Sequence, residues 1–458
     1  MRLAFVICLA CSIAPSAFAR STFSGPRVTG PGDLTEPRPA PIRVLGADPN
    51  TIVEITTERR DPDSHATAIL AAHATFRTDA HGDLDVSRAR PIEGTYQGIE
   101  PLGLFWSAAS RDTTANDPTP GPAVGPAPGN VRITVRARGK VIATLTTRSQ
   151  PDPARLVTRT DTPFPGAIFI QPAGPGRHPV IIVLGGSEGG SSTARSFAPL
   201  FAARGYATLG LPYYNPGYDP TSLVPGLPSS FTEIPVDRLA AVRNWLATQP
   251  GADADRIGIW GASKGAEFAL IAASRFGWIK AVAAIAASDL VWEGWGRRGP
   301  PASSFAFEGE PLAFQPYDGL DAELAKAAKG QRMDLRKVMD AGRNAFPARV
   351  AAARIPIERY HGALLVAGGG RDAIWPSAEM ASNIGDARRQ AHLPTIVLAY
   401  PSAGHLLGGP GTTPARPLME VGGEETAIAH ARAEVWEKTF ALFDAALKPA
   451  LPSRRKRP

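Results

Sequence analysis

Two patterns of hydrophobic and polar positions divide the chain near residue 153. Before it, short β-branched and aromatic runs recur with turn residues between them and without a helical period; they include TIVEITTE (51–58), LGLFWSA (102–108) and VRITVRA (131–137). Many short strands at such spacing are typical of a β-sandwich. The pattern therefore predicts an all-β, immunoglobulin-like domain over residues 41–152.

Beyond residue 153, apolar runs alternate with amphipathic segments. VIIVL (180–184) and IGIW (257–260) have the continuous apolar character of buried strands, whereas Val236–Thr248 carries apolar residues at helical spacing. This alternation predicts an α/β domain over 153–450, in which helices cover both faces of a mostly parallel sheet.

Three segments differ from both patterns. Residues 20–40 are rich in Pro, Gly and Ser, which predicts a flexible leader. Residues 295–350 interrupt the strand–helix alternation, and we expect this insertion to cap the active site. Residues 451–458 hold four positive charges; we expect a solvated basic tail, and the alternative is a segment that binds a polyanion or a membrane surface.

The first 19 residues have the pattern of a secretory signal peptide. Arg2 precedes an apolar run over 3–13 that is too short to span a bilayer, and AFA at 17–19 is a small-x-small cleavage site. We predict cleavage there and Sec-type export to the periplasm or the exterior; the alternative is a lipoprotein, because Cys8 and Cys11 lie in this segment. No later apolar run reaches 18 residues, so no integral membrane segment is expected after cleavage.

Composition excludes several kinds of chemistry. The 458-residue chain has only two cysteines, and both precede the predicted cleavage site. A mature chain without cysteine has no disulfide, thiolate zinc site, iron–sulfur cluster or cysteine nucleophile. It contains no H-E-x-x-H or EF-hand motif either, so we expect neither a metal nor a cofactor. The net charge of +7 is spread along the chain and does not indicate nucleic acid, and the oligomeric state stays open.

The candidate chemistry centres on GASKG, residues 261–265. A predicted strand precedes this G-x-S-x-G and a predicted helix follows it, which is the context that a nucleophile elbow requires. Ser263 would stand on the tight turn with its hydroxyl above the sheet, and Gly261 and Gly265 would leave room for the crowded backbone. The alternative is a Gly-rich turn in which Ser263 caps the helix.

A nucleophilic serine needs a base, and the base needs an orienting carboxylate. On this fold the partners follow the serine in the order acid, then histidine. His405 directly follows a predicted strand, at the sheet edge where the site is expected. Asp372 lies just beyond the preceding strand, 363–368, and Asp386 is the runner-up. We therefore predict Ser263 as nucleophile, His405 as base and Asp372 as the orienting acid.

Acyl transfer also needs hydrogen-bond donors for the developing oxyanion. One would be the backbone N–H of Lys264, which follows the nucleophile. The other would come from the Gly-rich loop LGGSEGGSS (184–192), with the N–H of Ser187 or Glu188 as the candidate. The alternative is a phosphate-binding loop, although neither G-x-x-x-x-G-K-[ST] nor G-x-G-x-x-G is present.

Several stretches carry a resemblance to a known family. They are residues 74–107, which contain GTYQGIEPLGLFW, LPYYN (211–215), GASKGAEFAL (261–270), DAIWPS (372–377) and YPSAGH (400–405). The chain resembles the acyl-CoA thioesterase and bile acid-CoA:amino acid N-acyltransferase family. The resemblance implies an N-terminal β-sandwich joined to an α/β-hydrolase domain, with the same three residues in the catalytic roles.

Two features depart from the family pattern. The amino acid N-acyltransferases of the family use a cysteine nucleophile, whereas Ser263 occupies the elbow here, so hydrolysis is favoured over conjugation. The predicted signal peptide would also take the enzyme away from CoA, which would change the substrate.

Three functions remain as hypotheses. The first is a serine hydrolase of the acyl-CoA thioesterase type, which acts on a small acyl thioester or ester and needs no cofactor. The second is an exported carboxylesterase or peptidase with the same triad. The third is a binding or assembly protein in which the hydrolase domain serves as a scaffold.

Overall fold

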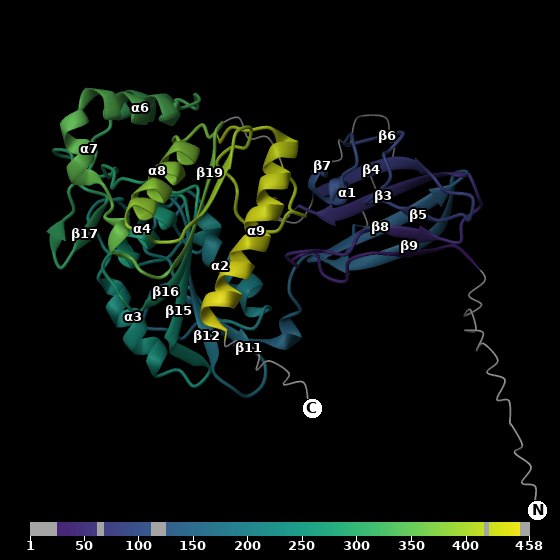
Figure 1. Ribbon diagram of the computed structural model, residues 1–458, viewed down its shortest axis with the longest axis horizontal. Helices are drawn as coiled ribbons and strands as arrows, with labels where there is room; N and C mark the ends of the chain where they lie inside the picture. The colour runs from purple at the N-terminus through teal and green to yellow at the C-terminus, as the bar shows by residue number, and fades with distance from the viewer. Residues whose placement is uncertain (1–24, 62–67, 111–124, 416–420, 449–458) are drawn as a thin grey trace, which may run out of the picture.

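The computed structural model describes residues 25–448 apart from 62–67, 111–124 and 416–420. The predicted signal peptide and basic tail therefore lie outside the described residues. Figure 1 shows two regions in chain order, an antiparallel β region and then a larger α/β region.

The N-terminal region contains two antiparallel sheets, of order β1-β2-β5 and β6-β4-β3-β8-β9, and β7 pairs with β4. Val53 and Ile55 of β3 are buried and alternate with more exposed residues, as expected for a strand with one covered face. Val28 and Val44 of the smaller sheet belong to the same hydrophobic core. The strands are β1 (Arg27–Thr29), β2 (Arg43–Leu45), β3 (Ile52–Arg60), β4 (Ile69–Arg77), β5 (Leu84–Asp85), β6 (Glu93–Gly94), β7 (Ala109–Ser110), β8 (Asn130–Ala137) and β9 (Lys140–Arg148).

Two segments of this region differ from the prediction. The leader was expected to be flexible, but its residues from 27 onward contribute β1 and the buried side chain of Leu34, which is 1% exposed. LGLFWSA, expected as a strand, contains instead the short helix α1 (Gly103–Trp106), all four residues of which are buried. A short apolar run does not distinguish a strand from a buried helical turn, which explains the second error. The immunoglobulin-like topology stays a prediction.

The α/β region is built on an eight-stranded sheet of order β10-β11-β13-β12-β15-β16-β19-β20. All pairs from β13 to β20 are parallel, and β11 is antiparallel to both of its neighbours, which confirms the predicted α/β class with a mostly parallel sheet. The strands are β10 (Leu156–Arg159), β11 (Ile168–Pro172), β12 (His178–Leu184), β13 (Ala207–Gly210), β15 (Ala252–Ala262), β16 (Ile279–Ile285), β19 (Ala363–Gly369) and β20 (Ile396–Tyr400).

Helices cover both faces of this sheet. In β12, Ile181 and Val183 belong to a core that includes residues of α2 and α9, whereas Val180 and Ile182 belong to a second core that includes residues of α3, α4 and α8. Successive side chains of a strand point to opposite faces, so the continuous apolar run of β12 serves both cores. The helices are α2 (Ser192–Ala202), α3 (Arg238–Ala247), α4 (Lys264–Ala273), α8 (Ser377–Gln390) and α9 (Glu425–Leu447).

The insertion between β16 and β19 contributes small elements outside the main sheet. Arg336 at the start of α6 donates from Nη1 to the backbone oxygen of Asp372 at 3.1 Å, so the insertion contacts the loop of the candidate acid. Its role as a cap stays a prediction. The remaining elements are β14 (Ile234–Pro235), β17 (Phe305–Phe307), β18 (Glu310–Pro311), α5 (Leu320–Ala327), α6 (Leu335–Ala345), α7 (Pro347–Ala353) and the 3₁₀ turns Pro153–Arg155, Pro220–Ser222 and Ile357–Arg359.

The two regions pack against each other along α9, which lies on the side of the sheet that faces the β region (Figure 1). One hydrophobic core includes buried residues of both regions. The indole Nε1 of Trp436 in α9 donates to the backbone oxygen of Thr35 at 3.0 Å. The segment predicted as a flexible leader is therefore held at the junction of the two regions.

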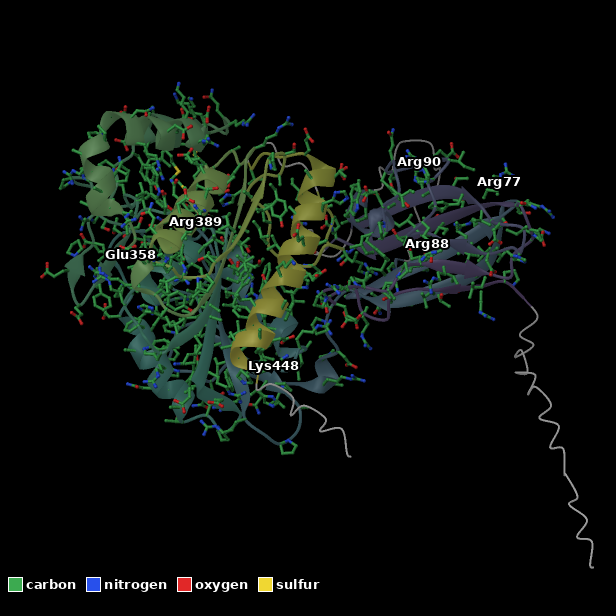
Figure 2. All side chains as sticks on the ribbon, in the orientation of Figure 1. Arg77, Arg88, Arg90, Glu358, Arg389 and Lys448 are labelled. Carbon is green, nitrogen blue, oxygen red and sulfur yellow. The ribbon has the colours of Figure 1, made fainter. Side chains whose placement is uncertain are left out.

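Basic side chains do not gather at one place among those labelled in Figure 2. Arg77, Arg88 and Arg90 lie on the β region, and Arg389 and Lys448 lie on the α/β region. Within the described ranges, no helix combines the length and the apolar character needed to cross a bilayer. That no nucleic acid binds stays a prediction.

Candidate active site

Ser263 stands at the turn between β15 and α4. Its backbone has φ 55° and ψ −122°, a left-handed conformation that is strained for a residue with a side chain. A Cβ on Gly261 would meet the backbone oxygen of Gly265 at 2.2 Å, and a Cβ on Gly265 would meet that of Gly185 at 2.3 Å. Only glycine fits at these two positions, because neighbouring backbone comes too close for any side chain. The Ser263 side chain makes no capping hydrogen bond to α4, which disfavours the helix-cap alternative.

The candidate acid and base form a buried pair. His405 Nδ1 and Asp372 Oδ2 are 2.7 Å apart, and their side chains are 8% and 0% exposed. The other oxygen of Asp372 accepts hydrogen bonds from the backbone N–H groups of Ile374 at 2.8 Å and Trp375 at 3.3 Å. The hydroxyl of Ser377 donates to Asp372 Oδ2 at 2.5 Å. The carboxylate is held on both oxygens, so the imidazole is held in one orientation, with Nε2 directed away from Asp372.

Ser263 and His405 lie on loops that follow strands of the same sheet. The backbone N–H of Ser263 donates to the oxygen of Ile285 at 2.9 Å, and the indole of Trp375 donates to Ala286 at 3.1 Å. The Trp375 ring lies edge-on to the His405 ring, with centroids 5.7 Å apart. No hydrogen bond joins Ser263 to His405 in the described structure. Catalytic hydrogen bonds are often long before substrate binds and shorten in the complex.

Asp386, the runner-up acid, lies elsewhere. It is an exposed residue of α8, and its Oδ1 accepts a hydrogen bond from Arg389 at 2.6 Å. A solvated carboxylate paired within its own helix has no contact with His405. The structure therefore favours Asp372.

Three backbone N–H groups remain available as oxyanion donors. The N–H groups of Lys264, Ser187 and Glu188 have no hydrogen-bond partner among the described residues. The loop of the last two approaches the nucleophile, because a Cβ on Gly186 would lie 3.0 Å from Ser263 Cβ. The Glu188 carboxylate is exposed and accepts a hydrogen bond from the N–H of Gly186 at 2.9 Å. Which of Ser187 and Glu188 supplies the second donor stays a prediction.

A buried ion pair that sequence reasoning missed lies in the first turn of α4, directly after the nucleophile. Lys264 Nζ and Glu267 Oε2 are 2.6 Å apart, with side chains that are 3% and 0% exposed. Burial lowers the pKa of Lys264 and raises the pKa of Glu267, although each charge opposes the shift of the other. Lys264 also donates to Ser304 at 2.9 Å, and Glu267 accepts from the backbone N–H of Trp292 at 3.0 Å. The spacing of a Lys and a Glu on one face of an otherwise apolar helix was the available signal.

The described residues contain no group of three or more His, Cys, Asp or Glu side chains placed to hold a metal ion. A small cleft lies beside the Gly-rich loop, and its lining includes Glu188, Tyr213 and Tyr214. Ser263, Asp372 and His405 are not among its lining residues.

Comparison with known proteins identifies the family. Residues 240–449 match the family model described as BAAT/acyl-CoA thioester hydrolase C terminal, and residues 37–150 match the acyl-CoA thioester hydrolase/BAAT N-terminal region. The chain belongs to the acyl-CoA thioester hydrolase/BAAT family. The predicted resemblance is therefore confirmed, as is the prediction of an enzyme of the thioester hydrolase type at the level of the family. Residues 166–287 also match the dienelactone hydrolase family.

Relatives in this family extend over most of the chain. The human mitochondrial acyl-coenzyme A thioesterase 2 is 28% identical over 433 residues, which cover 88% of this chain and 80% of the relative. The peroxisomal succinyl-coenzyme A thioesterase of Mus musculus is 28% identical over 448 residues, which cover 88% and 92%. Among solved structures, a dienelactone hydrolase from Klebsiella pneumoniae is similar, with 18% identity, a TM-score of 0.36, and coverage of 60% of this chain and 91% of that chain.

The predicted export is contradicted by these relatives. Those whose names state a compartment are mitochondrial or peroxisomal, and their sequences match 88% of this chain. The apolar run behind Arg2 lies outside the described residues. A short apolar run beside one positive charge is a weak pattern, and it is outweighed by the family of the remaining chain.

Proposed function

We propose that this enzyme hydrolyses acyl-CoA thioesters to free carboxylic acids through a Ser263–His405–Asp372 triad and an acyl-enzyme. The observation that carries the proposal is a serine on a strained strand–helix turn beside a buried histidine–carboxylate pair, in a chain of the acyl-CoA thioester hydrolase family. These are the groups that acyl transfer to serine requires, in the order in which this fold supplies them.

In the first half of the reaction, Ser263 Oγ attacks the thioester carbonyl while His405 Nε2 takes the hydroxyl proton. Asp372 stabilises the imidazolium through its bond to Nδ1. The N–H of Lys264 and that of Ser187 or Glu188 would donate to the oxyanion of the tetrahedral intermediate. As the intermediate collapses, the C–S bond breaks, and the thiol leaves with the proton returned by His405.

In the second half, water replaces the thiol. His405 removes a proton from the water as its oxygen attacks the acyl carbonyl, and a second tetrahedral intermediate forms. Its collapse breaks the bond to Ser263 Oγ, which recovers the proton, and the carboxylic acid is released. Water is a sufficient acceptor for a serine ester, so the proposal is hydrolysis and not conjugation to an amine.

The choice of CoA thioesters rests on the relatives. The names of the relatives described above contain acyl- or succinyl-coenzyme A. The one objection to such a substrate was the predicted export, and that prediction is contradicted. A carboxylesterase with the same triad is the competing function, which a substrate screen distinguishes.

The test is a panel of acyl-CoAs and p-nitrophenyl esters, with thiol release and ester cleavage followed in parallel. Ser263→Ala should lower kcat by at least about 10⁴-fold on acyl-CoA. Ser274→Ala is the matched control, because Ser274 follows the other end of α4 and its hydroxyl donates to the backbone oxygen of Ile271 at 2.7 Å, away from His405 and Asp372. Full activity of Ser263→Ala would refute the mechanism, and cleavage of esters without any acyl-CoA hydrolysis would select the carboxylesterase.

A further inference from the structure

The ten residues that follow the candidate base connect the two regions of the molecule. We call residues 406–415 the strap. It begins at the peptide after His405, which follows β20, and ends against the β region at Trp106, whose backbone oxygen accepts a hydrogen bond from the N–H of Ala415 at 2.8 Å. The segment that follows His405 in the chain therefore leads directly to a contact between the two regions.

Arg432 of α9 holds the strap near both of its ends. Its Nη2 donates to the backbone oxygen of Leu406 at 3.0 Å and its Nε to the same oxygen at 3.3 Å. Its Nη1 donates to the oxygens of Thr413 and Pro414 at 3.3 Å each. Arg432 is 5% exposed, and no carboxylate pairs with it among the described residues. A buried guanidinium without a counter-ion costs free energy, so its three carbonyl partners are what stabilise it there.

Thr412 holds the far end of the strap against the N-terminal β region. Its hydroxyl donates to the backbone oxygen of Leu34 at 2.7 Å, and its own backbone oxygen accepts from Arg59 at 3.2 Å. Thr412 is 3% exposed and Leu34 is 1% exposed, so water does not compete for the bond between them. This contact joins residues that are 378 positions apart in the sequence.

The strap also packs against the strand that carries the nucleophile. A Cβ on Gly408 would lie 3.0 Å from the ring of Trp260, three residues before Ser263 in β15. On the other side of His405, its backbone N–H donates to the oxygen of Val421 at 2.9 Å. The backbone of the base is thus fixed on its amino side by Val421 and on its carboxyl side by the strap.

We propose that the N-terminal β region serves catalysis by positioning His405 through the strap, with Arg432 and Thr412 as positioning residues. The proposal rests on the proposed function, because it assigns the strap a role only if His405 is the base. A displacement of about 1 Å between reacting groups can cost 10²-fold in rate. Loosening the strap therefore lowers kcat by letting the imidazole leave its position beside Asp372.

The decisive variant is Thr412→Val, which removes the hydroxyl and keeps the shape of the side chain. Thr78→Val is the matched control, since Thr78 is 2% exposed and its hydroxyl donates to the oxygen of Asp48 at 2.8 Å. Thr78 directly follows Arg77, the last residue of β4, and Arg77 lies on the side of the β region away from the α/β region (Figure 2). The Thr78 hydroxyl also lies 3.3 Å from the oxygen of Thr51 and accepts a hydrogen bond from the N–H of Thr51 at 2.9 Å. Thr78→Val therefore removes at least as many buried hydrogen bonds as Thr412→Val, but only the Thr412 bond holds the strap.

The experiment measures kcat and KM on an acyl-CoA and the rate of labelling by a fluorophosphonate, with unfolding temperature as a stability check. Thr412→Val is expected to lower kcat and the labelling rate together by about 5- to 50-fold with KM little changed. Thr412→Ser, which keeps the hydroxyl, should recover most of the rate, and Thr78→Val should retain it. Arg432→Lys keeps the positive charge but loses the several N–H donors of the guanidinium. Its kcat and labelling rate should fall to a similar extent as those of Thr412→Val.

Two outcomes overturn the proposal. One is wild-type kcat in both Thr412→Val and Arg432→Lys; the other is an equal loss of kcat in Thr412→Val and Thr78→Val, which would mean a general effect of stability. If Thr412→Val does not fold, Arg432→Lys and Thr412→Ser decide by the same comparison with wild type. Failure of the triad would be recognised separately, because Ser263→Ala would then keep its activity.

Discussion

The buried ion pair behind the nucleophile predicts a specific pattern of stability. We consider Lys264→Met, Glu267→Gln and the double variant. Each single substitution leaves one charged or polar partner without its counterpart in a site that is closed to water. The double substitution removes both, and replacement of a buried pair by uncharged groups of similar volume is often close to neutral.

The magnitude follows from the geometry. At 2.6 Å, two unit charges attract by about 6 kcal/mol at an effective dielectric constant of 20, and desolvation offsets much of this. The rings of Phe231, Phe305 and Trp295 lie 5.2, 5.3 and 5.8 Å from Lys264 Nζ and also favour the cation. We therefore expect each single variant to lose about 3–5 kcal/mol of unfolding free energy at pH 8, and the double variant to lose less than the sum.

The free energy of unfolding of Lys264→Met should depend on pH, and the direction of that dependence can be tested. Burial raises the pKa of Glu267 in the folded state, and Lys264→Met removes the cation that opposes this rise. A raised folded pKa means that the folded state binds the proton more tightly than the unfolded state. The contribution of Glu267 to the stability of Lys264→Met should thus be most favourable below about pH 4.3, the ordinary pKa of a glutamate, and should be lost as the pH rises through the folded pKa.

The assay is denaturant unfolding of the four proteins at pH 5 and pH 8, followed by tryptophan fluorescence. The penalty of Lys264→Met should be smaller at pH 5, because Glu267 is then more easily protonated. The reasoning is refuted if either single variant costs less than about 1 kcal/mol at pH 8. It is refuted equally if the penalty of Lys264→Met is the same at both pH values.

Three further predictions concern the site. Asp372→Asn should lower kcat by on the order of 10³–10⁴-fold, whereas Asp386→Asn should leave it unchanged, as steady-state kinetics will show. Ser377→Ala removes the 2.5 Å donor to the Asp372 carboxylate and should lower kcat by about 10-fold; an unaltered kcat would show that the backbone donors suffice. Gly265→Ala forces a Cβ to 2.3 Å from backbone and should cost more than about 3 kcal/mol in chemical unfolding, whereas Gly277→Ala, with no atom within 4 Å of its Cβ, should cost little.

Much of the fold could be read from local pattern. The apolar run of β12, the alternating residues of β3 and the helical spacing before Thr248 each report the surface that one element buries. The nucleophile elbow could also be predicted from the sequence, because the tight turn needs small residues on both sides of Ser263. Chain order then selected His405 and Asp372, and the structure places these two side chains in contact.

The sequence patterns gave wrong predictions where a segment is buried by residues that are distant along the chain. The leader reads as flexible because it is rich in Gly and Pro, yet Leu34 is buried between the β region and the strap. The run around Phe105 has the pattern of a strand, but it contains a helical turn of four buried residues, which a short apolar run does not distinguish from a strand. Export was inferred from a terminal pattern, and the family of the whole chain overturned it.

The sequence by itself determined the elements, their order and the identity of the candidate nucleophile, base and acid. These depend on the period of apolar residues and on steric needs within a few positions, which short-range chemistry encodes. Only the tertiary structure decided that Lys264 and Glu267 are buried together, and that Arg432 and Thr412 hold the loop of the base. Such contacts form when folding brings together groups that are distant along the chain and excludes water from them. A local sequence pattern does not show which distant residues will pack against a given side chain.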